Sequence, residues 1–205
     1  MFLYGASGHC KVVIDAIELA STKTIDGVFD DNPKGEFIAG IPILDTKVAE
    51  VPIAADFVIT IGNNVLRKKI ANKLDANFKS VFHTKSIIAK SVSVGDGTVV
   101  LAGAIVNSDV KIGKHCIINS NVVLEHDCEI ANYVHVSPSA SLAGNVVVGE
   151  GTHIGIGSSV IQGIQIGKWV TVGAGSVIIK DIPDYAVVVG NPGKIIKYNN
   201  TDLGL

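Results

Sequence analysis

The sequence predicts a small N-terminal α/β domain of the Rossmann-like type, followed by a left-handed parallel β-helix built from hexapeptide repeats. The β-helix is predicted because branched aliphatic residues recur at every sixth position from Ile88 to Ile178. The α/β domain is predicted because short apolar runs alternate with glycine turns and helical patterns before the repeat begins. Two prolines interrupt the repeat after Ile178. We therefore expect three segments: the Rossmann-like domain at 1–84, the β-helix at 85–180 and a C-terminal cap at 181–205.

A period of six residues fits neither an amphipathic helix nor a simple strand alternation. It fits a flat strand followed by a corner, with three such strands closing one triangular coil. Neighbouring coils then pair as parallel strands, so residues 18 apart lie in one column, and the repeat makes about five coils. The interior aliphatic residues are Ile88, Val94, Val100, Val106, Ile112, Ile118, Leu124, Ile130, Val136, Leu142, Val148, Ile154, Val160, Ile166, Val172 and Ile178.

Small or β-branched residues stand two positions before most of these aliphatic residues and share the interior with them. Cys116 and Cys128 occupy this small interior phase, so we expect packed, inert thiols rather than nucleophiles. Together with Cys10 they make three cysteines, none of them in a CxxC pair. This pattern predicts neither disulfides nor a zinc site.

The segment before the repeat, at 1–84, predicts a parallel sheet, because strands alternate with helices. Such a sheet binds ligands at the carboxyl ends of its strands. The expected strands are Phe2–Tyr4, Ile25–Phe29, Phe57–Ile61 and Phe78–Phe82, with helices over His9–Leu19 and over a basic segment containing Arg67, Lys68 and Lys69.

Three features follow these strands: the sequence GASGH at residues 5–9, the pair Asp30 and Asp31, and Gly62. A glycine turn before a helix offers free amides to phosphate, and the acidic pair suits ribose or a base. A nucleotide attached to a sugar would satisfy both features. A nicotinamide cofactor is not expected, because only G-x-x-G of the GxGxxG fingerprint is present. The alternative is that these are ordinary strand-to-helix turns with a solvated acidic pair.

Composition and charge exclude several classes of function. The net charge is −2 and no run of basic residues could follow a phosphate backbone, so nucleic acid is not an expected partner. The N-terminus lacks the basic and long apolar regions of a signal peptide, which predicts a cytoplasmic protein. Its apolar runs are far shorter than the roughly 20 residues that a membrane-spanning helix requires.

The sequence Glu125-His126-Asp127 places three ionisable groups on one corner, immediately after the interior residue Leu124. A neutral histidine beside a carboxylate has a fixed tautomer and a raised basicity, as a general base needs near neutral pH. A solvated surface histidine is the alternative. A step of one coil from His126 gives Gly144, whose amide could stabilise an oxyanion.

His135 and His153 are also one coil apart and are expected to stack in one column. No Asp, Glu or Cys accompanies them at the same phase, so we expect a hydrogen bond to a ligand or a neighbouring group instead of a metal.

Over nearly its whole length the sequence resembles the sugar O-acyltransferases of the sialic acid O-acetyltransferase type. The resemblance is strongest to the nucleotide-aminosugar N-acetyltransferases of bacterial glycan pathways. It is carried, in order, by the segments YGASGHCKVV, FDD, IGNNVLRKKI, NSNVVLEHDCEI, HVSPSASLAGNVVVG and VVVGNPGK. The repeat alone is typical of the superfamily, whereas GASGH together with EHD is more specific.

The resemblance implies a homotrimer that binds acetyl-CoA along the β-helix, between adjacent subunits, and the sugar nucleotide on the N-terminal domain. It implies that His126 is the general base and that Asp127, often Glu in the family, orients it. It also implies acetyl-CoA contacts and substrate contacts. The former are His135, Gly144, Ile156 and Ala174, and the latter are Ser7, Gly8, His9, Asp30, Asp31, Gly62 and, in the acceptor pocket, Asn119.

The leading hypothesis is therefore acetyl transfer from acetyl-CoA to the 4-amino group of a nucleotide-linked 4-amino-4,6-dideoxyhexose. A thioester is already activated, so direct attack needs positioning, a proton acceptor and an oxyanion donor, without a covalent intermediate or a metal. Three alternatives remain open at this point. They are O-acetylation of a sugar such as sialic acid, a non-catalytic nucleotide-sugar-binding protein, and a zinc enzyme on the same scaffold.

Overall fold

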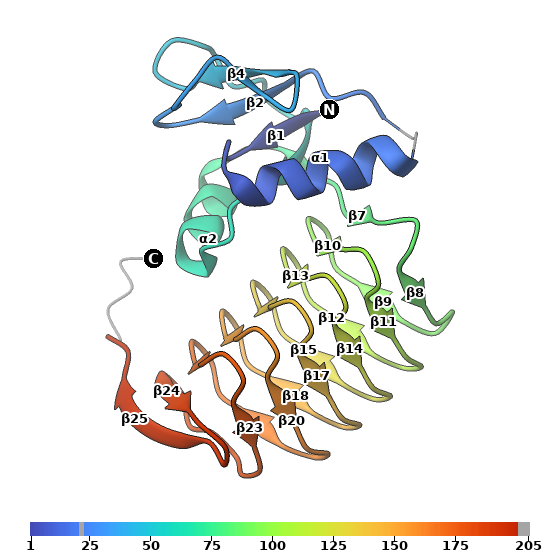
Figure 1. Ribbon diagram of the computed structural model, residues 1–205. Coiled ribbons are helices and arrows are strands. Elements are labelled where there is room, and N and C mark those ends of the chain that lie inside the picture. The colour runs from blue at the N-terminus through green and yellow to red at the C-terminus, as the bar shows by residue number, and fades with distance from the viewer. Residues whose placement is uncertain (21–22, 201–205) are drawn as a thin grey trace.

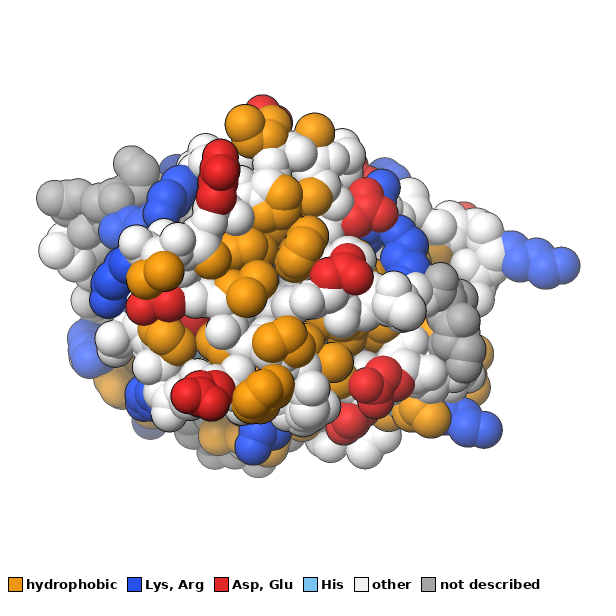
Figure 2. All heavy atoms as spheres, turned by 90° about the horizontal axis from the view of Figure 1, so that it is seen from above, with side chains coloured by type: hydrophobic (Ala, Val, Ile, Leu, Met, Phe, Trp, Pro, Cys, Tyr) orange, Lys and Arg blue, Asp and Glu red, His pale blue; other side chains and the backbone are white. Residues whose placement is uncertain are grey.

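The computed structural model describes residues 1–20 and 23–200. An α/β domain occupies the N-terminal part of the chain, and a triangular parallel β-helix occupies the rest (Figure 1). The predicted fold class is therefore confirmed. Seen from above, the side of the N-terminal domain that faces away from the β-helix shows apolar side chains gathered near its centre, with Asp and Glu side chains around them (Figure 2).

The N-terminal sheet has the strand order β3-β4-β2-β1-β5-β6. All neighbouring strands are parallel except the hairpin of β3 and β4, which the sequence did not predict. Helices α1 and α2 connect β1 to β2 and β5 to β6. The elements are β1 (Phe2–Tyr4), α1 (Gly8–Ala20), β2 (Gly27–Asp30), β3 (Phe37–Ile38), β4 (Ile41–Asp45), β5 (Asp56–Ile59), α2 (Asn64–Lys73) and β6 (Asn77–Phe78).

The predicted strand Phe78–Phe82 is wrong as a single element. Its first part is β6, which pairs with β5 and closes the N-terminal sheet. Its last part is β7 (Val81–Phe82), which pairs with a strand of the first complete β-helix coil. The chain passes from one domain to the other between Phe78 and Val81, so an apolar run that reads as one strand serves two sheets.

The β-helix has three faces, each a sheet of parallel two-residue strands. The first face contains β7, β10 (Val99–Val100), β13 (Ile117–Ile118), β16 (His135–Val136), β19 (His153–Ile154) and β22 (Thr171–Val172). The second contains β8 (Ile87–Ile88), β11 (Ile105–Val106), β14 (Val123–Leu124), β17 (Ser141–Leu142), β20 (Ser159–Val160) and β23 (Val177–Ile178). The third contains β9 (Ser93–Val94), β12 (Lys111–Ile112), β15 (Glu129–Ile130), β18 (Val147–Val148) and β21 (Gln165–Ile166).

Neighbouring coils pair in the register that the repeat predicts: Ile118 pairs with Val136, and Leu124 with Leu142. The second residue of each strand points inward, and the interior aliphatic residues from Val100 to Ile178 are buried in one cluster. The small residues two positions earlier share this core. Cys116 and Cys128 are fully buried there, and burial raises the pKa of the Cys116 thiol to about 11. The prediction that both thiols are packed in the interior is confirmed.

We call the corners of a coil first, second and third; they follow the first, second and third faces in chain order. From Gly97 to Gly175 each corner contains one residue with positive φ, three positions after an interior aliphatic residue. Asp127, with φ of 61°, occupies this position in one second corner. The glycines directly after the aliphatic residues have a different cause: a Cβ at Gly149 would lie 2.5 Å from the backbone of the next coil.

The N-terminal domain packs on the first face of the β-helix. Helix α1 contacts β7, and Val13 and Ile17 share one apolar cluster with Val99 and Ile117 (Figure 1). The outward side chains of the first coils on this face are therefore buried beneath α1.

At the other end of the β-helix, β24 (Ala186–Val189) extends the first face by pairing with β22. It then forms an antiparallel hairpin with β25 (Lys194–Tyr198). This hairpin lies in the predicted C-terminal cap, whose end, at 201–205, lies outside the described residues.

Within residues 1–20 and 23–200, no helix has the length and apolar character needed to cross a membrane.

Candidate active site

His126 lies on a second corner, between β14 and β15, and its side chain is 58% exposed. Its Nδ1 lies 2.8 Å from Oδ2 of Asp127. Asp127 therefore reaches the ring despite its short side chain. Asp127 also occupies the positive-φ position of the corner, and Asp tolerates this conformation better than a longer side chain. The hydrogen bond leaves Nε2 of His126 directed away from Asp127.

Gly144 lies one coil beyond His126, and the imidazole ring rests against it. A Cβ at Gly144 would come within 2.6 Å of both Cε1 and Nε2 of His126, so the ring has this place only because Gly144 has no side chain. Its amide N–H donates to no acceptor in the described part of the chain. The column that the sequence predicted is thus present, with a histidine ring against a glycine that has a free amide.

The predicted histidine stack is present on the first face. The rings of His135 and His153 are parallel within 3°, with centroids 4.8 Å apart. Nε2 of His135 is 3.1 Å from Nδ2 of Asn119, and Nε2 of His153 is 2.7 Å from the Ser137 hydroxyl. Asn119 and Ser137 are themselves one coil apart, so the pairing repeats on two successive coils. The role of Ser137 was not predicted, but the same step of one coil from Asn119 would have found it.

His9 brings the GASGH turn against this stack. Its ring centroid lies 6.5 Å from that of His135. Burial and the charge of Arg67 lower the pKa of His9 to about 4, and burial together with His153 lowers the pKa of His135 to about 3. Both rings are neutral at physiological pH. Nε2 of His9 and Nδ1 of His135 are buried and make no close hydrogen bond among the described residues, although the Gly62 backbone lies near the His135 ring.

Asp30, the last residue of β2, and Asp31, directly after it, bond to different partners. Asp30 accepts hydrogen bonds from the Ala6 and Asn32 amides through its two carboxylate oxygens, and so holds the GASGH turn against β2. Asp31 accepts two hydrogen bonds through Oδ1, from the hydroxyls of Tyr4 and Thr46. These bonds lower the pKa of the Asp31 carboxyl, chiefly through Thr46. Oδ2 of Asp31 has no partner among the described residues, which leaves it open to a ligand donor.

The predicted residues form two groups within one chain. Ser7, Gly8, His9, Asp30, Asp31 and Gly62 gather at the carboxyl ends of β1, β2 and β5, next to the first face with His135 and its partner Asn119. Ile156 and Ala174 lie exposed on first corners, the same edge as Asn119. His126, Asp127 and Gly144 lie on second corners, along a different edge of the prism.

The predicted basic helix is present as α2, but the sequence analysis did not place Arg67 in the interior. Arg67 is 1% exposed and lies on the same helix face as Asn64 and Ile70, which are also buried. Lys68 is only partly buried, in an ion pair with Glu150, and Lys69 is exposed. The spacing of three residues between Asn64, Arg67 and Ile70 was the signal that could have placed Arg67 inside.

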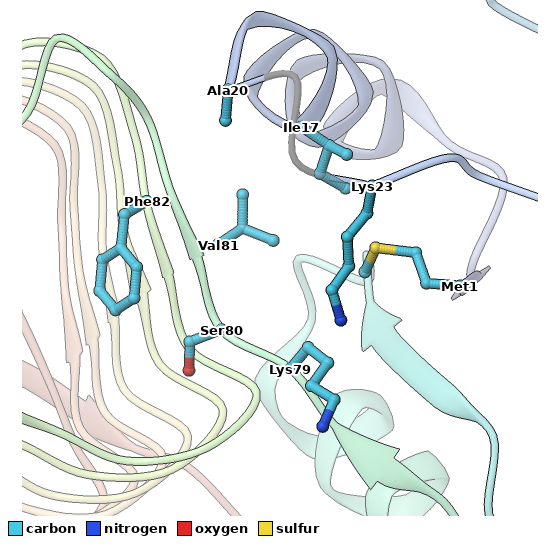
Figure 3. Close-up of a pocket in the computed structure, with 8 residues that line it drawn as sticks. All are labelled: Met1, Ile17, Ala20, Lys23, Lys79, Ser80, Val81 and Phe82. Carbon is cyan, nitrogen blue, oxygen red and sulfur yellow. The ribbon is translucent and has the colours of Figure 1, made fainter.

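Two cavities of about 330 Å³ lie close to the N-terminal domain. One is lined by the end of α1, by Lys23 and Lys79 and by β7, and contains none of the predicted site residues (Figure 3). The other lies where the start of α2 meets the first face, and His153 and Trp169 line it. Among the described residues, no group of three His, Cys, Asp or Glu side chains could hold a metal ion.

Comparison with known proteins matches both parts of the chain to family models. Residues 1–74 match the PglD N-terminal domain, and residues 91–126, 109–144 and 145–180 match the bacterial transferase hexapeptide (six repeats). The structure of perosamine N-acetyltransferase from Caulobacter crescentus, in complex with CoA and GDP-perosamine, superposes with a TM-score of 0.88. It is 31% identical, over 96% of both chains. The chain belongs to the PglD-type hexapeptide N-acetyltransferases.

Two further members of this family are similar to the chain. The acetyltransferase domain of PglB from Neisseria gonorrhoeae, in complex with acetyl coenzyme A, has a TM-score of 0.87 and is 32% identical. The alignment covers 95% of this chain and 98% of that domain. UDP-N-acetylbacillosamine N-acetyltransferase from Bacillus subtilis is 42% identical over 108 residues, which are 49% of this chain. The chain thus spans half, 50%, of the length of that curated relative.

Proposed function

We propose that the protein transfers an acetyl group from acetyl-CoA to the 4-amino group of a nucleotide-linked 4-amino-4,6-dideoxyhexose. The main support is the full-length similarity to a perosamine N-acetyltransferase whose structure holds CoA and GDP-perosamine. The GASGH turn, Asp31 and Gly62 then form the nucleotide-sugar site, with Asp30 holding the turn. The proposal places the reaction in the cytoplasm, where acetyl-CoA is available.

In the proposed reaction the sugar amine attacks the thioester carbonyl, a C–N bond forms, and the C–S bond breaks to release coenzyme A. His126 accepts the amine proton through Nε2, and the proton can then pass to the departing sulfur. Asp127 holds Nδ1 of the ring, which fixes the tautomer with Nε2 unprotonated. The free amide of Gly144 is a candidate donor to the oxyanion. A preformed thioester needs no nucleophilic cysteine.

The residues present fit acetyl-CoA along the first corners. Ile156 and Ala174 are exposed there at the same phase and offer an apolar and a small surface to an extended chain. The side-chain amide of Asn119 supplies a polar contact near the start of this edge, and His135 holds that amide through Nε2. These residues would bind and orient the thioester.

The separation of the two groups of residues supports a homotrimer with sites between subunits. His126 and the proposed acetyl-CoA edge lie on different corners, so one chain cannot close both around the same carbonyl. A second copy can bring its own edge against the His126 corner. The second face between these corners carries outward apolar residues at Ile87, Ile105 and Val123, and Ile87 is 66% exposed in the single chain.

The function is tested by incubating the purified protein with acetyl-CoA and a panel of UDP-linked 4-amino sugars, GDP-perosamine and CMP-sialic acid. We expect coenzyme A release with an amino sugar and a product carrying one acetyl group that resists hydroxylamine, as an amide does and an ester does not. Turnover of the sialic acid substrate alone would instead establish O-acetylation. Nucleotide-sugar binding without any turnover would establish a non-catalytic binding protein.

Mixing two inactive variants tests the shared site. His126→Ala removes the proposed base, and Ala174→Trp blocks the proposed acetyl-CoA edge, so each variant alone should be inactive. In mixed trimers some interfaces combine an intact corner with an intact edge, and random mixing should restore about a quarter of the wild-type rate. The measurement is the acetylation rate after the two variants are refolded together. The double variant His126→Ala with Ala174→Trp, mixed with either single variant, is the control and should restore nothing. A lack of recovery despite proven mixed trimers would place the whole site within one subunit.

A further inference from the structure

Arg67 is a buried cation that no step above uses. Its side chain is 1% exposed, and its guanidinium group has five N–H donors. Nε donates to the His115 carbonyl, Nη1 to the carbonyls of Ile61 and Gly62, and Nη2 to the Tyr133 carbonyl and to Oδ1 of Asn64. The number of bonds equals the number of donors, so the full hydrogen-bonding capacity of the group is used.

These acceptors belong to both halves of the proposed site. Ile61 and Gly62 form the turn after β5 that is proposed to contact the sugar nucleotide. His115 and Tyr133 lie on third corners of adjacent coils, and Tyr133 is two residues before His135. One planar group therefore contacts both the substrate turn and the β-helix that is proposed to bind acetyl-CoA.

Asn64 extends the same contact to a further coil. Its Oδ1 accepts from Arg67, and its Nδ2 donates to the carbonyls of Gly151 and Thr152. His115, Tyr133 and Gly151 are equivalent positions on three successive coils, all with positive φ. No backbone amide in the described residues donates to the carbonyls of these three residues. Helix α2 thus satisfies a row of corner carbonyls that the coil-to-coil ladder leaves unpaired.

Burying the charged guanidinium of Arg67 costs desolvation free energy, which indicates that the hydrogen bonds of Arg67 are needed to hold these backbone segments in place. The guanidinium forms no ion pair with a carboxylate among the described residues, and burial lowers its pKa to about 10, so it stays protonated at neutral pH. Replacing buried charged groups by well-packed apolar residues of similar volume is often neutral or stabilising. A methionine would fill the space without desolvating a charge. What it cannot do is donate a hydrogen bond to any of the five oxygen atoms that Arg67 contacts.

We propose that Arg67, supported by Asn64, is a positioning residue for acetyl transfer. It fixes the Gly62 turn at a set distance from the β-helix, so that a sugar bound to the N-terminal domain reaches the thioester in a reactive geometry. This inference rests on the proposed function for its catalytic consequence. Displacement of a reacting group by about 1 Å can cost about 100-fold in rate. If the contact between the Gly62 turn and the β-helix were loose, kcat would therefore fall even with both ligands bound.

The test compares Arg67→Lys and Arg67→Met with Lys69→Met on the exposed side of the same helix. Lysine keeps the charge but has three donors for five acceptors. We expect kcat to fall at least about tenfold in both Arg67 variants, while the Kd for CoA alone stays within about threefold. Lys69→Met should match the wild type in both. Asn64→Ala removes fewer of the contacts between α2 and the β-helix and should also lower kcat. It replaces the Arg67 variants as the test if these do not fold.

Hydrogen exchange gives a readout that does not depend on turnover. In the Arg67 variants, amides of residues 60–70 should exchange faster, while the β-helix strands β13 to β17 keep their protection. A folded Arg67→Lys protein with wild-type kcat and unchanged exchange would overturn the inference. A uniform loss of protection or of CoA binding would overturn it too, because Arg67 would then act through overall stability. If the wild type acetylates no amino sugar, the proposed function fails. The hydrogen exchange of residues 60–70 still shows, in that case, whether Arg67 holds the Gly62 turn in place.

Discussion

His126→Ala is expected to lower kcat by at least about 100-fold, the usual contribution of a positioned general base. KM for the amino sugar and for acetyl-CoA should change little, because the ring is proposed to act on the proton rather than to bind either ligand. The side chain is 58% exposed and, among residues 1–20 and 23–200, bonds only to Asp127, so its removal leaves the core intact. Steady-state kinetics with both substrates measure the loss, and thermal unfolding confirms that the fold is retained.

His83→Ala is the matched control. His83 is another corner histidine of the β-helix, and its ring accepts a hydrogen bond from the Lys85 amide. It begins the first corner of the first coil, at the opposite end of the β-helix from Ile156 and Ala174, and is none of the proposed site residues, so its variant should retain the wild-type kcat. A His126→Ala enzyme with wild-type kcat would remove the histidine from the reaction and leave proton transfer to solvent. A loss of acetylation in both variants would show that the corner histidines stabilise the β-helix rather than take part in the reaction.

The β-helix could be predicted from the sequence because its constraint is local and repeated. One inward side chain at every sixth position leaves a period that no helix or ordinary strand produces, and the register between coils follows from closing three strands into a coil. The positive-φ positions are also periodic, yet they hold His115, Tyr133 and Trp169 as well as Gly, Asn and Asp. Bulky side chains at these corners stack along the edge, as His115 and Tyr133 do, which hides the phase in the sequence.

The candidate site could be predicted where it lies in columns of the β-helix or at the carboxyl ends of the N-terminal strands. His126 against Gly144, and His135 against His153, follow from counting one coil along the chain. The contacts between the domains have no such rule. The division of Phe78–Phe82 between two sheets, and the β-helix carbonyls to which Arg67 donates, depend on where the N-terminal domain docks, and short-range patterns carry no information about that.

Gly144→Ala is expected to lower kcat by about 100-fold, although it adds only one methyl group. The backbone of Gly144 does not have the positive φ that would disfavour alanine, so the cost is steric: the new Cβ would lie 2.6 Å from Cε1 and Nε2 of His126 and must displace the ring. Gly35→Ala is the control, since a Cβ there meets nothing within 4 Å and the backbone is equally permissive. It should keep the wild-type rate.

A double variant distinguishes the two possible roles of Gly144. If the glycine acts by seating His126, then Gly144→Ala should cost almost nothing further in the His126→Ala background, because the ring that it displaces is already gone. If the Gly144 amide instead stabilises the oxyanion and the added methyl group disturbs that contact, the two losses should multiply. Alanine retains the amide N–H, so we expect the first result. If the two losses in kcat multiply, Gly144 acts on the thioester carbonyl, and the absence of a side chain beneath His126 needs a different explanation.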